Sequence, residues 1–210
     1  MALFLLFLVG TLAGHMDARA AEGPAKITEI VPIILKNATT SVDNFAPDQH
    51  RGMIVRAWRD TGNAHGYYRY MVMVEGGGDR KPWHLATIDT HDQKRGERGP
   101  EMDTIRDAPH TFEDIVESVK FARAKVNGEP RTLMIVAIRD TGKADSLADK
   151  TPVDVEFYQL TIGDEEDGTP PYYFDRIQAV RVKGTYSNAD CALAKEVAAV
   201  LGPSAAVCGP

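Results

Sequence analysis

The sequence predicts an α+β protein made of two copies of a strand-strand-strand-helix unit. The motif Ala-x-Arg-Asp-Thr-Gly occurs twice, at Ala57–Gly62 and at Ala137–Gly142, and each copy follows an apolar run. Behind each motif lies a segment of alternating apolar residues, the period-two pattern of a strand with one buried face. Each half then ends in a segment with apolar residues at helical spacing. We therefore expect antiparallel sheets, two packed helices and pseudo-two-fold symmetry.

The N-terminus has the features of a secretory signal over residues 1–20. The apolar run Leu3–Gly14 is about a dozen residues long, which is too short to span a bilayer. Ala18-Arg19-Ala20 follows, with the small-x-small pattern that signal peptidases recognise. We expect cleavage before Ala21, a periplasmic or secreted location, and no stable membrane anchor afterwards. Residues 21–50 form an N-terminal extension, in which the β-branched segment Ile27–Leu35 predicts a strand.

Each unit contributes three predicted strands joined by polar loops. In chain order they are residues 51–59, 68–76 and 82–89 in the first unit (51–130), and 131–139, 156–164 and 174–182 in the second unit (131–210). Three strands and one helix enclose only a small core, so we expect the two units to share one. They form either one continuous six-stranded sheet with both helices on one face or two sheets that face each other.

The two predicted helices have similar start and stop signals. Thr111 and Ser187 are hydroxyl N-caps with a carboxylate three residues further on, close to a capping box. Asn127-Gly128 and Gly202-Pro203 are the corresponding stop signals. The second helix carries Cys191, and Cys208 lies 17 positions later. Two cysteines in an exported chain predict a disulfide, which pins the C-terminal tail against this helix.

The overall charge restricts the class of partner. The chain has a formal net charge of −6 and no basic stripe along a predicted element. This argues against a nucleic-acid partner and against an anionic membrane surface. The histidines and carboxylates show no zinc spacing, and the acidic run after Asp164 lacks the alternating oxygen ligands of a calcium loop. We therefore expect no cofactor and no metal, and a protein or small-molecule ligand.

The repeated Arg-Asp-Thr-Gly is first of all a good turn sequence. Its Asp accepts a hydrogen bond from the backbone two residues on, and its Gly adopts a positive φ without strain. Asp-Thr-Gly, once in each of two related halves, also resembles the active-site signature of aspartic proteases. That resemblance implies a dyad of Asp60 and Asp140 that shares one proton. Arg59 and Arg139 stand where that family has an apolar residue, and the resemblance covers only three residues per half.

The loops that differ between the two copies are the candidate recognition surfaces. The first copy carries a basic loop at Gly76–Pro82, and the second an acidic loop at Gly163–Pro171. Aromatic residues beside turns are suited to anchor a partner. The candidate binding residues, taken from these loops and from the repeated turns, are Arg59, Tyr67, Arg80, Arg139, Asp164 and Tyr172.

These features lead to a primary functional hypothesis and two alternatives. The primary hypothesis is an exported binding or inhibitor-like module that recognises a protein or another macromolecule through hairpin loops. The first alternative is a hydrolase that uses Asp60 and Asp140, or a carboxylate paired with His65. The second alternative is a structural component of the cell envelope that associates through an edge strand.

Overall fold

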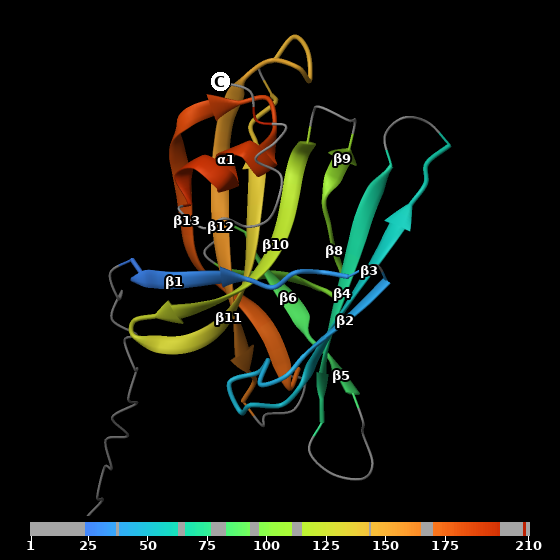
Figure 1. Ribbon diagram of the computed structural model, residues 1–210, viewed down its shortest axis with the longest axis vertical. Coiled ribbons are helices and arrows are strands. Elements are labelled where there is room, and N and C mark those ends of the chain that lie inside the picture. The colour runs from blue at the N-terminus through green and yellow to red at the C-terminus, as the bar shows by residue number, and fades with distance from the viewer. Residues whose placement is uncertain are drawn as a thin grey trace, which may run out of the picture.

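The computed structural model is a two-sheet β-fold with a single helix among the residues that it describes (Figure 1). The described residues are 24–36, 38–62, 66–76, 83–92, 97–110, 115–142, 144–164, 170–197 and 208. The prediction of an α+β fold with two packed helices is therefore wrong. No helix in these described ranges has the length and apolar character needed to cross a membrane.

The larger sheet is built around four long strands at its centre. Its order is β1-β10-β11-β12-β13-β6-β7, and the short strand β9 pairs with β10. All neighbours are antiparallel except β13 and β6, which run parallel. The strands are β1 (Ile27–Pro32), β6 (Thr87–Asp92), β7 (Glu97–Met102), β9 (Ala108–His110), β10 (Ile115–Val126), β11 (Glu129–Arg139), β12 (Thr151–Ile162) and β13 (Tyr172–Tyr186).

The smaller sheet holds the first copy of the repeated motif. Its order is β2-β3-β4-β5, with the short strand β8 paired to β4. The strands are β2 (Ala38–Val42), β3 (Gly52–Arg59), β4 (Tyr67–Glu75), β5 (Trp83–Leu85) and β8 (Ile105–Arg106). The first motif connects β3 to β4, and the second connects β11 to β12 in the larger sheet. The two copies thus form hairpins in different sheets.

Both faces of the larger sheet are covered by apolar side chains. One face packs against the smaller sheet, and the buried side chains of this inter-sheet core include Ile54, Tyr70, Val72, Phe121, Met134, Leu160 and Phe174. The other face packs against the helix through Ala122, Leu133, Ile135, Val155, Ala192 and Leu193. The aromatic rings of Tyr70, Phe121 and Phe174 lie at centroid distances of 6.0 and 6.2 Å, and they join the two sheets across the core.

The first predicted helix is a strand instead. Residues 111–114 lie outside the described residues, and Ile115–Val126 form β10. Apolar residues on both faces of this strand imitated helical spacing, because Val119 packs into one core and Ala122 into the other. Asn127 and Gly128 have φ of 52° and 91°, and Val126 pairs with Glu129 across them. Asn-Gly is therefore the two-residue turn of a β-hairpin and not the end of a helix.

The second predicted helix exists, but it is shorter than expected. Helix α1 covers Ala189–Glu196, and its N-cap is Asn188 instead of Ser187. The Asn188 side chain accepts a hydrogen bond of 2.8 Å from the backbone N–H of Asp190. The predicted disulfide is confirmed, because Cys191 of α1 is bonded to Cys208. A structural disulfide of this kind is typical of proteins outside the cytosol.

The two copies of Arg-Asp-Thr-Gly adopt different turns. In the first, Asp60 Oδ1 accepts a hydrogen bond of 2.8 Å from the Gly62 N–H, and Gly62 has a φ of 71°. In the second, Asp140 faces Arg181 at 3.5 Å, and Gly142 does not adopt the left-handed conformation. The same four residues therefore adopt different backbone conformations in the two hairpins, and only the first copy needs a left-handed glycine.

This difference predicts unequal effects of alanine at the two glycines. Gly62→Ala places a Cβ on a left-handed residue, which costs roughly 1–2 kcal/mol of folding free energy. At Gly142 a Cβ meets only the Asp140 carboxylate, at an ordinary 3.6 Å, so we expect a change within about 0.5 kcal/mol. Urea unfolding of both variants measures this, and equal losses would contradict the assignment of two turn types.

Candidate functional site

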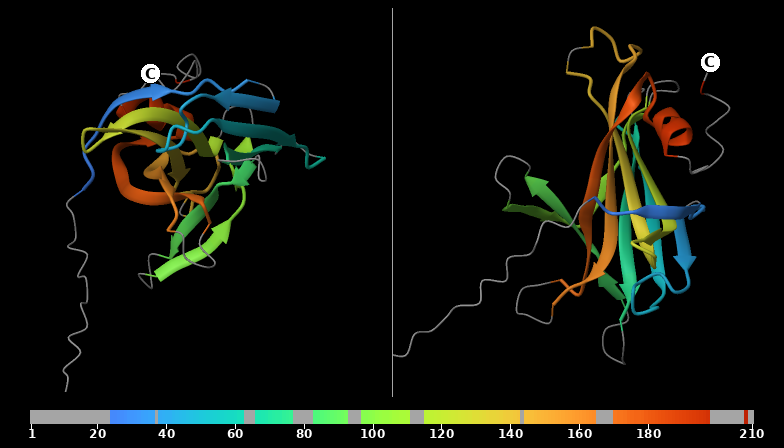
Figure 2. Two further views of the ribbon diagram at one scale, coloured as in Figure 1. Left: turned by 90° about the horizontal axis from the view of Figure 1, so that it is seen from below. Right: turned by 90° about the vertical axis from the view of Figure 1, so that its left-hand side faces the viewer.

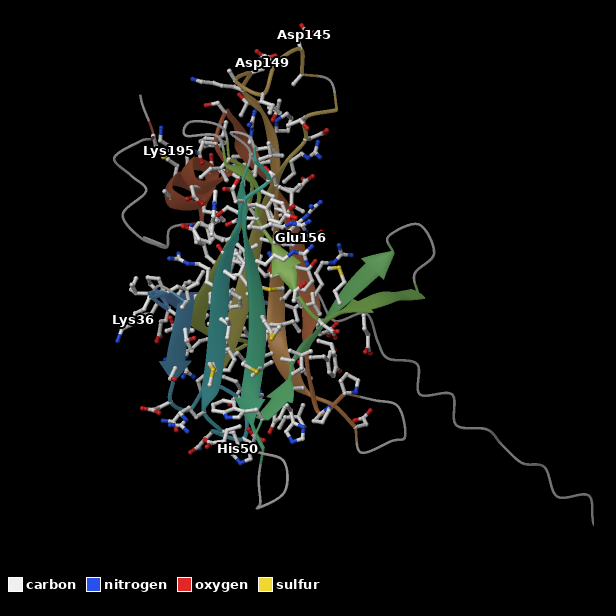
Figure 3. The ribbon with its side chains drawn as sticks, turned by 90° about the vertical axis from the view of Figure 1, so that its right-hand side faces the viewer. Lys36, His50, Asp145, Asp149, Glu156 and Lys195 are labelled. Carbon is white, nitrogen blue, oxygen red and sulfur yellow. A yellow bond between two sulfur atoms is a disulfide. The ribbon has the colours of Figure 1, made fainter. Side chains whose placement is uncertain are left out.

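A cleft of about 730 Å³ opens between the two sheets, next to the inter-sheet core. Both sheets supply side chains to it. Apolar positions on its wall are Ile88, Met102, Ile105, Val136 and Ile138, and the charged or hydroxyl-bearing positions are Arg69, Asp103, Thr104, Arg106, Glu117, Glu156, Tyr158 and Arg176. Glu156 lies at mid-height of the molecule, between Asp145 and Asp149 at one end and His50 at the other (Figure 3).

Strand register places the polar side chains of the larger sheet on one face. Glu117 of β10 is opposite Ile138 of β11, and Val136 of β11 is opposite Glu156 of β12. Because side chains alternate along a strand, Glu117 shares its face with Val119, which is buried in the inter-sheet core. The apolar core therefore ends within two residues of Glu117, and the cleft begins there.

Strands β6 and β7 form one border of the cleft. Figure 2 shows this pair standing away from the body of the sandwich. Strand β6 is attached to the larger sheet by its parallel pairing with β13, at Tyr173 and Phe174. The pair contributes Ile88 and Met102 to the wall of the cleft. A polar segment leads from Met102 into β8, so the same stretch of chain passes from one sheet to the other.

Glu156 is fully engaged by partners within the cleft. Its Oε1 accepts a hydrogen bond of 2.8 Å from Arg176 Nη1, and its Oε2 accepts one of 2.6 Å from the Tyr158 hydroxyl. The Glu156 and Arg176 side chains are both only 14% exposed. Burial, together with the bond to the Glu156 carboxylate, raises the pKa of Tyr158 above its usual range. Glu156 is therefore a satisfied anion in this arrangement.

Glu117 lies in the same cleft without such compensation. In the part of the chain that the structure describes, no ion pair or hydrogen bond reaches its carboxylate. Burial raises the pKa of Glu117 to about 7, and the negative charges of Asp107 and Glu156 act in the same direction. The positive charge of the Arg106 guanidinium lowers the pKa of Glu117, but by less than burial and the two carboxylates raise it. Near neutral pH this carboxyl group is therefore divided between its neutral and charged forms.

Three arginines surround one tyrosine on the smaller sheet. The guanidinium carbons of Arg59, Arg69 and Arg106 lie 5.7, 6.0 and 5.3 Å from the ring centroid of Tyr67. Burial acts to raise the pKa of Tyr67, but hydrogen bonds from Arg69 and Arg106 and the charge of Arg59 lower it overall. Among the described residues, no ion pair joins these guanidinium groups to a carboxylate. We call Arg59, Arg69 and Arg106 the arginine cluster.

A buried carboxylate holds the strand that carries Arg106. Asp107 is 3% exposed and follows β8 directly. It accepts hydrogen bonds of 2.7 Å from the backbone N–H of Tyr68 and from the hydroxyl of Tyr70. These bonds complement the backbone pairing of Arg69 with Arg106 between β4 and β8. They position Arg69 and Arg106 side by side at the cleft.

The structure brings two of the six predicted binding residues together. Arg59 and Tyr67 lie in contact within the arginine cluster. Arg139 is buried, and it donates hydrogen bonds to the backbone carbonyls of Leu147, Asp149 and Tyr186. It therefore organises the loop between β11 and β12.

Two of the remaining predicted binding residues, Tyr172 and Asp164, lie away from this group. The Tyr172 hydroxyl donates to Asp48 at 2.6 Å and is 3.0 Å from His50 Nδ1, at the end opposite to Asp145 and Asp149 (Figure 3). Asp164 follows β12 in the loop that leads to Tyr172. Arg80 lies outside the described residues.

The two candidate catalytic aspartates have separate partners. Asp60 bonds to its own turn in the smaller sheet, whereas Asp140 faces Arg181 of the larger sheet. No group of three or more metal-ligating side chains is present among the described residues. The cleft residues Arg69, Arg106, Glu117, Glu156 and Arg176 were not predicted from the sequence. The available signal was a glutamate that interrupts an apolar strand, as in Ile-Val-Glu-Ser-Val at residues 115–119.

Comparison with known proteins shows a likeness of fold. The chain superposes on the crystal structure of CarG with a TM-score of 0.60 and 16% sequence identity, over 79% of this chain and 94% of that chain. At this identity the similarity establishes the shared fold alone. No protein-family model matches the chain, and the search of curated proteins gave no match.

The raised pKa of Glu117 predicts a pH-dependent effect of Glu117→Gln on stability. The folded state retains the Glu117 proton from the unfolded value of 4.5 up to about 7, so its contribution to stability is lost as pH rises through that window. Glutamine does not titrate. We therefore expect the unfolding free energy of Glu117→Gln to match that of the natural protein near pH 4 and to exceed it by about 3 kcal/mol near pH 8.

Urea unfolding at the two pH values measures this effect. Glu129→Gln is the matched control, because Glu129 is exposed at the other end of the same hairpin. An equal gain for Glu117→Gln at both pH values would show that the effect is not one of charge.

Proposed function

We propose that the protein is an exported binding module whose cleft holds a ligand with an anionic group. The observation that carries this proposal is that Arg69 and Arg106 line a cleft between two sheets and have no carboxylate partner within the described residues. Guanidinium groups bind carboxylates and phosphates through paired hydrogen bonds, so two adjacent arginines form a natural receptor for such a group. Arg69 Nη1 already donates to Thr104 Oγ1 at 3.1 Å, which orients it.

The composition of the cleft suits a small organic ligand or the end of a longer one. Its volume of about 730 Å³ falls in the usual range for ligand sites, and its walls combine five apolar side chains with eight charged or hydroxyl-bearing ones. The proposal keeps part of the earlier hypothesis, because Arg59 and Tyr67 at the end of the β3–β4 hairpin adjoin the cleft. It moves the main contact from the hairpin loops to the space between the sheets.

The proposed export has two supports. Residues 1–20 have the sequence features of a secretory signal, and the disulfide between Cys191 and Cys208 is suited to an oxidising compartment. The proposed location is therefore the periplasm or the exterior of the cell.

Two fluorescent dyes test the anion site directly. The probe is 8-anilinonaphthalene-1-sulfonate, an aromatic anion, and its uncharged counterpart is N-phenyl-1-naphthylamine. We expect the purified protein to bind the sulfonate dye more tightly than the uncharged dye. Arg69→Gln combined with Arg106→Gln should weaken binding of the sulfonate dye by about tenfold, as expected for the loss of charge-assisted hydrogen bonds. Binding of the uncharged dye should not change.

Arg131→Gln is the control variant, because Arg131 lies on β11 outside the cleft. Circular dichroism of each variant confirms that the dye reports on a folded protein. Equal affinity of the natural protein and the double variant for the sulfonate dye would overturn the proposal.

A further inference from the structure

We propose that the ligand of this cleft is a small zwitterion with an apolar body, such as a short peptide with aliphatic side chains. Its carboxylate binds Arg69 and Arg106, and its ammonium group binds Glu117. This inference rests on the proposed function, and it adds the second charge and the apolar body of the ligand.

The two charges of the cleft come from different sheets. Arg69 belongs to β4 and Arg106 to β8, both in the smaller sheet, whereas Glu117 belongs to β10 in the larger sheet. A ligand that reaches across the cleft therefore meets positive charge on one side and a carboxylate on the other. A molecule with a single anionic group satisfies only the first side, and it leaves the half-buried Glu117 without an ion-pair partner.

Glu117 is the carboxylate inside the cleft that remains for a ligand, because Asp103 on its wall is exposed to solvent. Glu156 lies in the same cleft, but Arg176 and the Tyr158 hydroxyl already occupy both of its oxygens. The groups that face Glu117 are Arg106 and Asp107 from the segment containing β8, and Glu156 from β12. Two of these three are anionic, so an ammonium group at this position relieves their repulsion as well as compensating Glu117.

Apart from Asp103 and Thr104, the remaining wall of the cleft is apolar. Ile88 and Met102 come from the β6–β7 pair, Ile105 from β8, and Val136 and Ile138 from β11. Aliphatic side chains of a ligand would bury against these residues, and each buried CH₂ group contributes roughly 0.8 kcal/mol. This favours a peptide with aliphatic residues over a fully polar zwitterion.

Binding of an ammonium group also has a consequence for protonation. Glu117 is partly protonated near pH 7, and a neighbouring cation favours its charged form. Binding should therefore release a proton, and affinity should rise from about pH 5 to pH 7. Above about pH 8 it should fall again, because the amino group of the ligand loses its own charge there. Titration calorimetry in two buffers of different ionisation enthalpy detects this release.

Calorimetry with three forms of one dipeptide tests the proposal. The probes are L-leucyl-L-leucine, its N-acetyl form and its C-terminal amide. We expect the free dipeptide to bind, and each capped form to bind about tenfold more weakly. Glu117→Gln should remove the discrimination against the N-acetyl form. Arg69→Gln combined with Arg106→Gln should remove the discrimination against the amide, and Glu129→Gln should change neither.

The outcomes separate this inference from the proposed function. Equal binding of the free and N-acetyl forms, or no binding of the free dipeptide at millimolar concentration, overturns the zwitterion. If the sulfonate dye still binds in an arginine-dependent way, that result supports the anion site and overturns only the proposal that the ligand is a zwitterion. If dye binding is independent of Arg69 and Arg106, the proposed function is contradicted as well.

Discussion

The burial of strands β10, β11 and β12 on both faces is the constraint on which the rest of the structure depends. One face packs against the smaller sheet and the other against α1. The residues in the doubly covered part of these strands must therefore suit an apolar environment or have a partner there. Thr132 meets this demand by donating to the Phe45 carbonyl, and Ser118 by donating to Asp190. These bonds also tie the β2–β3 loop and the start of α1 to the central sheet.

The cleft exists because the apolar packing between the two sheets ends before the long strands of the larger sheet do. Two residues before Val119, the face of β10 toward the smaller sheet carries Glu117, and the same face of β12 carries Glu156. Arg176 neutralises the charge of Glu156 within the protein, but no such ion pair compensates Glu117. The pKa of Glu117 is raised because removing its charged form from water is unfavourable. A site that keeps a half-buried carboxylate at a cost to stability is consistent with a functional role.

Sequence reasoning succeeded where local chemistry decides the structure and failed where burial on two faces decides it. The Asp60 turn and the disulfide were predicted from a few neighbouring residues or from cysteine number alone. Residues 115–126 were misassigned as a helix, because apolar residues on both faces of a strand produce helix-like spacing. Asn127-Gly128 fits a helix end or a hairpin, and only the pairing of Val126 with Glu129 distinguishes the two. Arg59 and Tyr67 were predicted as binding residues because they flank a turn, whereas Arg106 and Glu117 lie far from that turn in the sequence and meet only in the folded structure.

The sequence by itself determined the two strand-turn-strand segments around Arg-Asp-Thr-Gly and the disulfide from Cys191 to Cys208. Turn residues and cysteines act through short-range geometry and covalent chemistry, which neighbouring letters specify. Tertiary structure alone decided that the two hairpins lie in different sheets, that Gly62 and Gly142 have different backbone conformations, and that Glu117 faces Arg106. These outcomes depend on which distant strands pair, and the free energy of that pairing comes from burial shared over the whole chain.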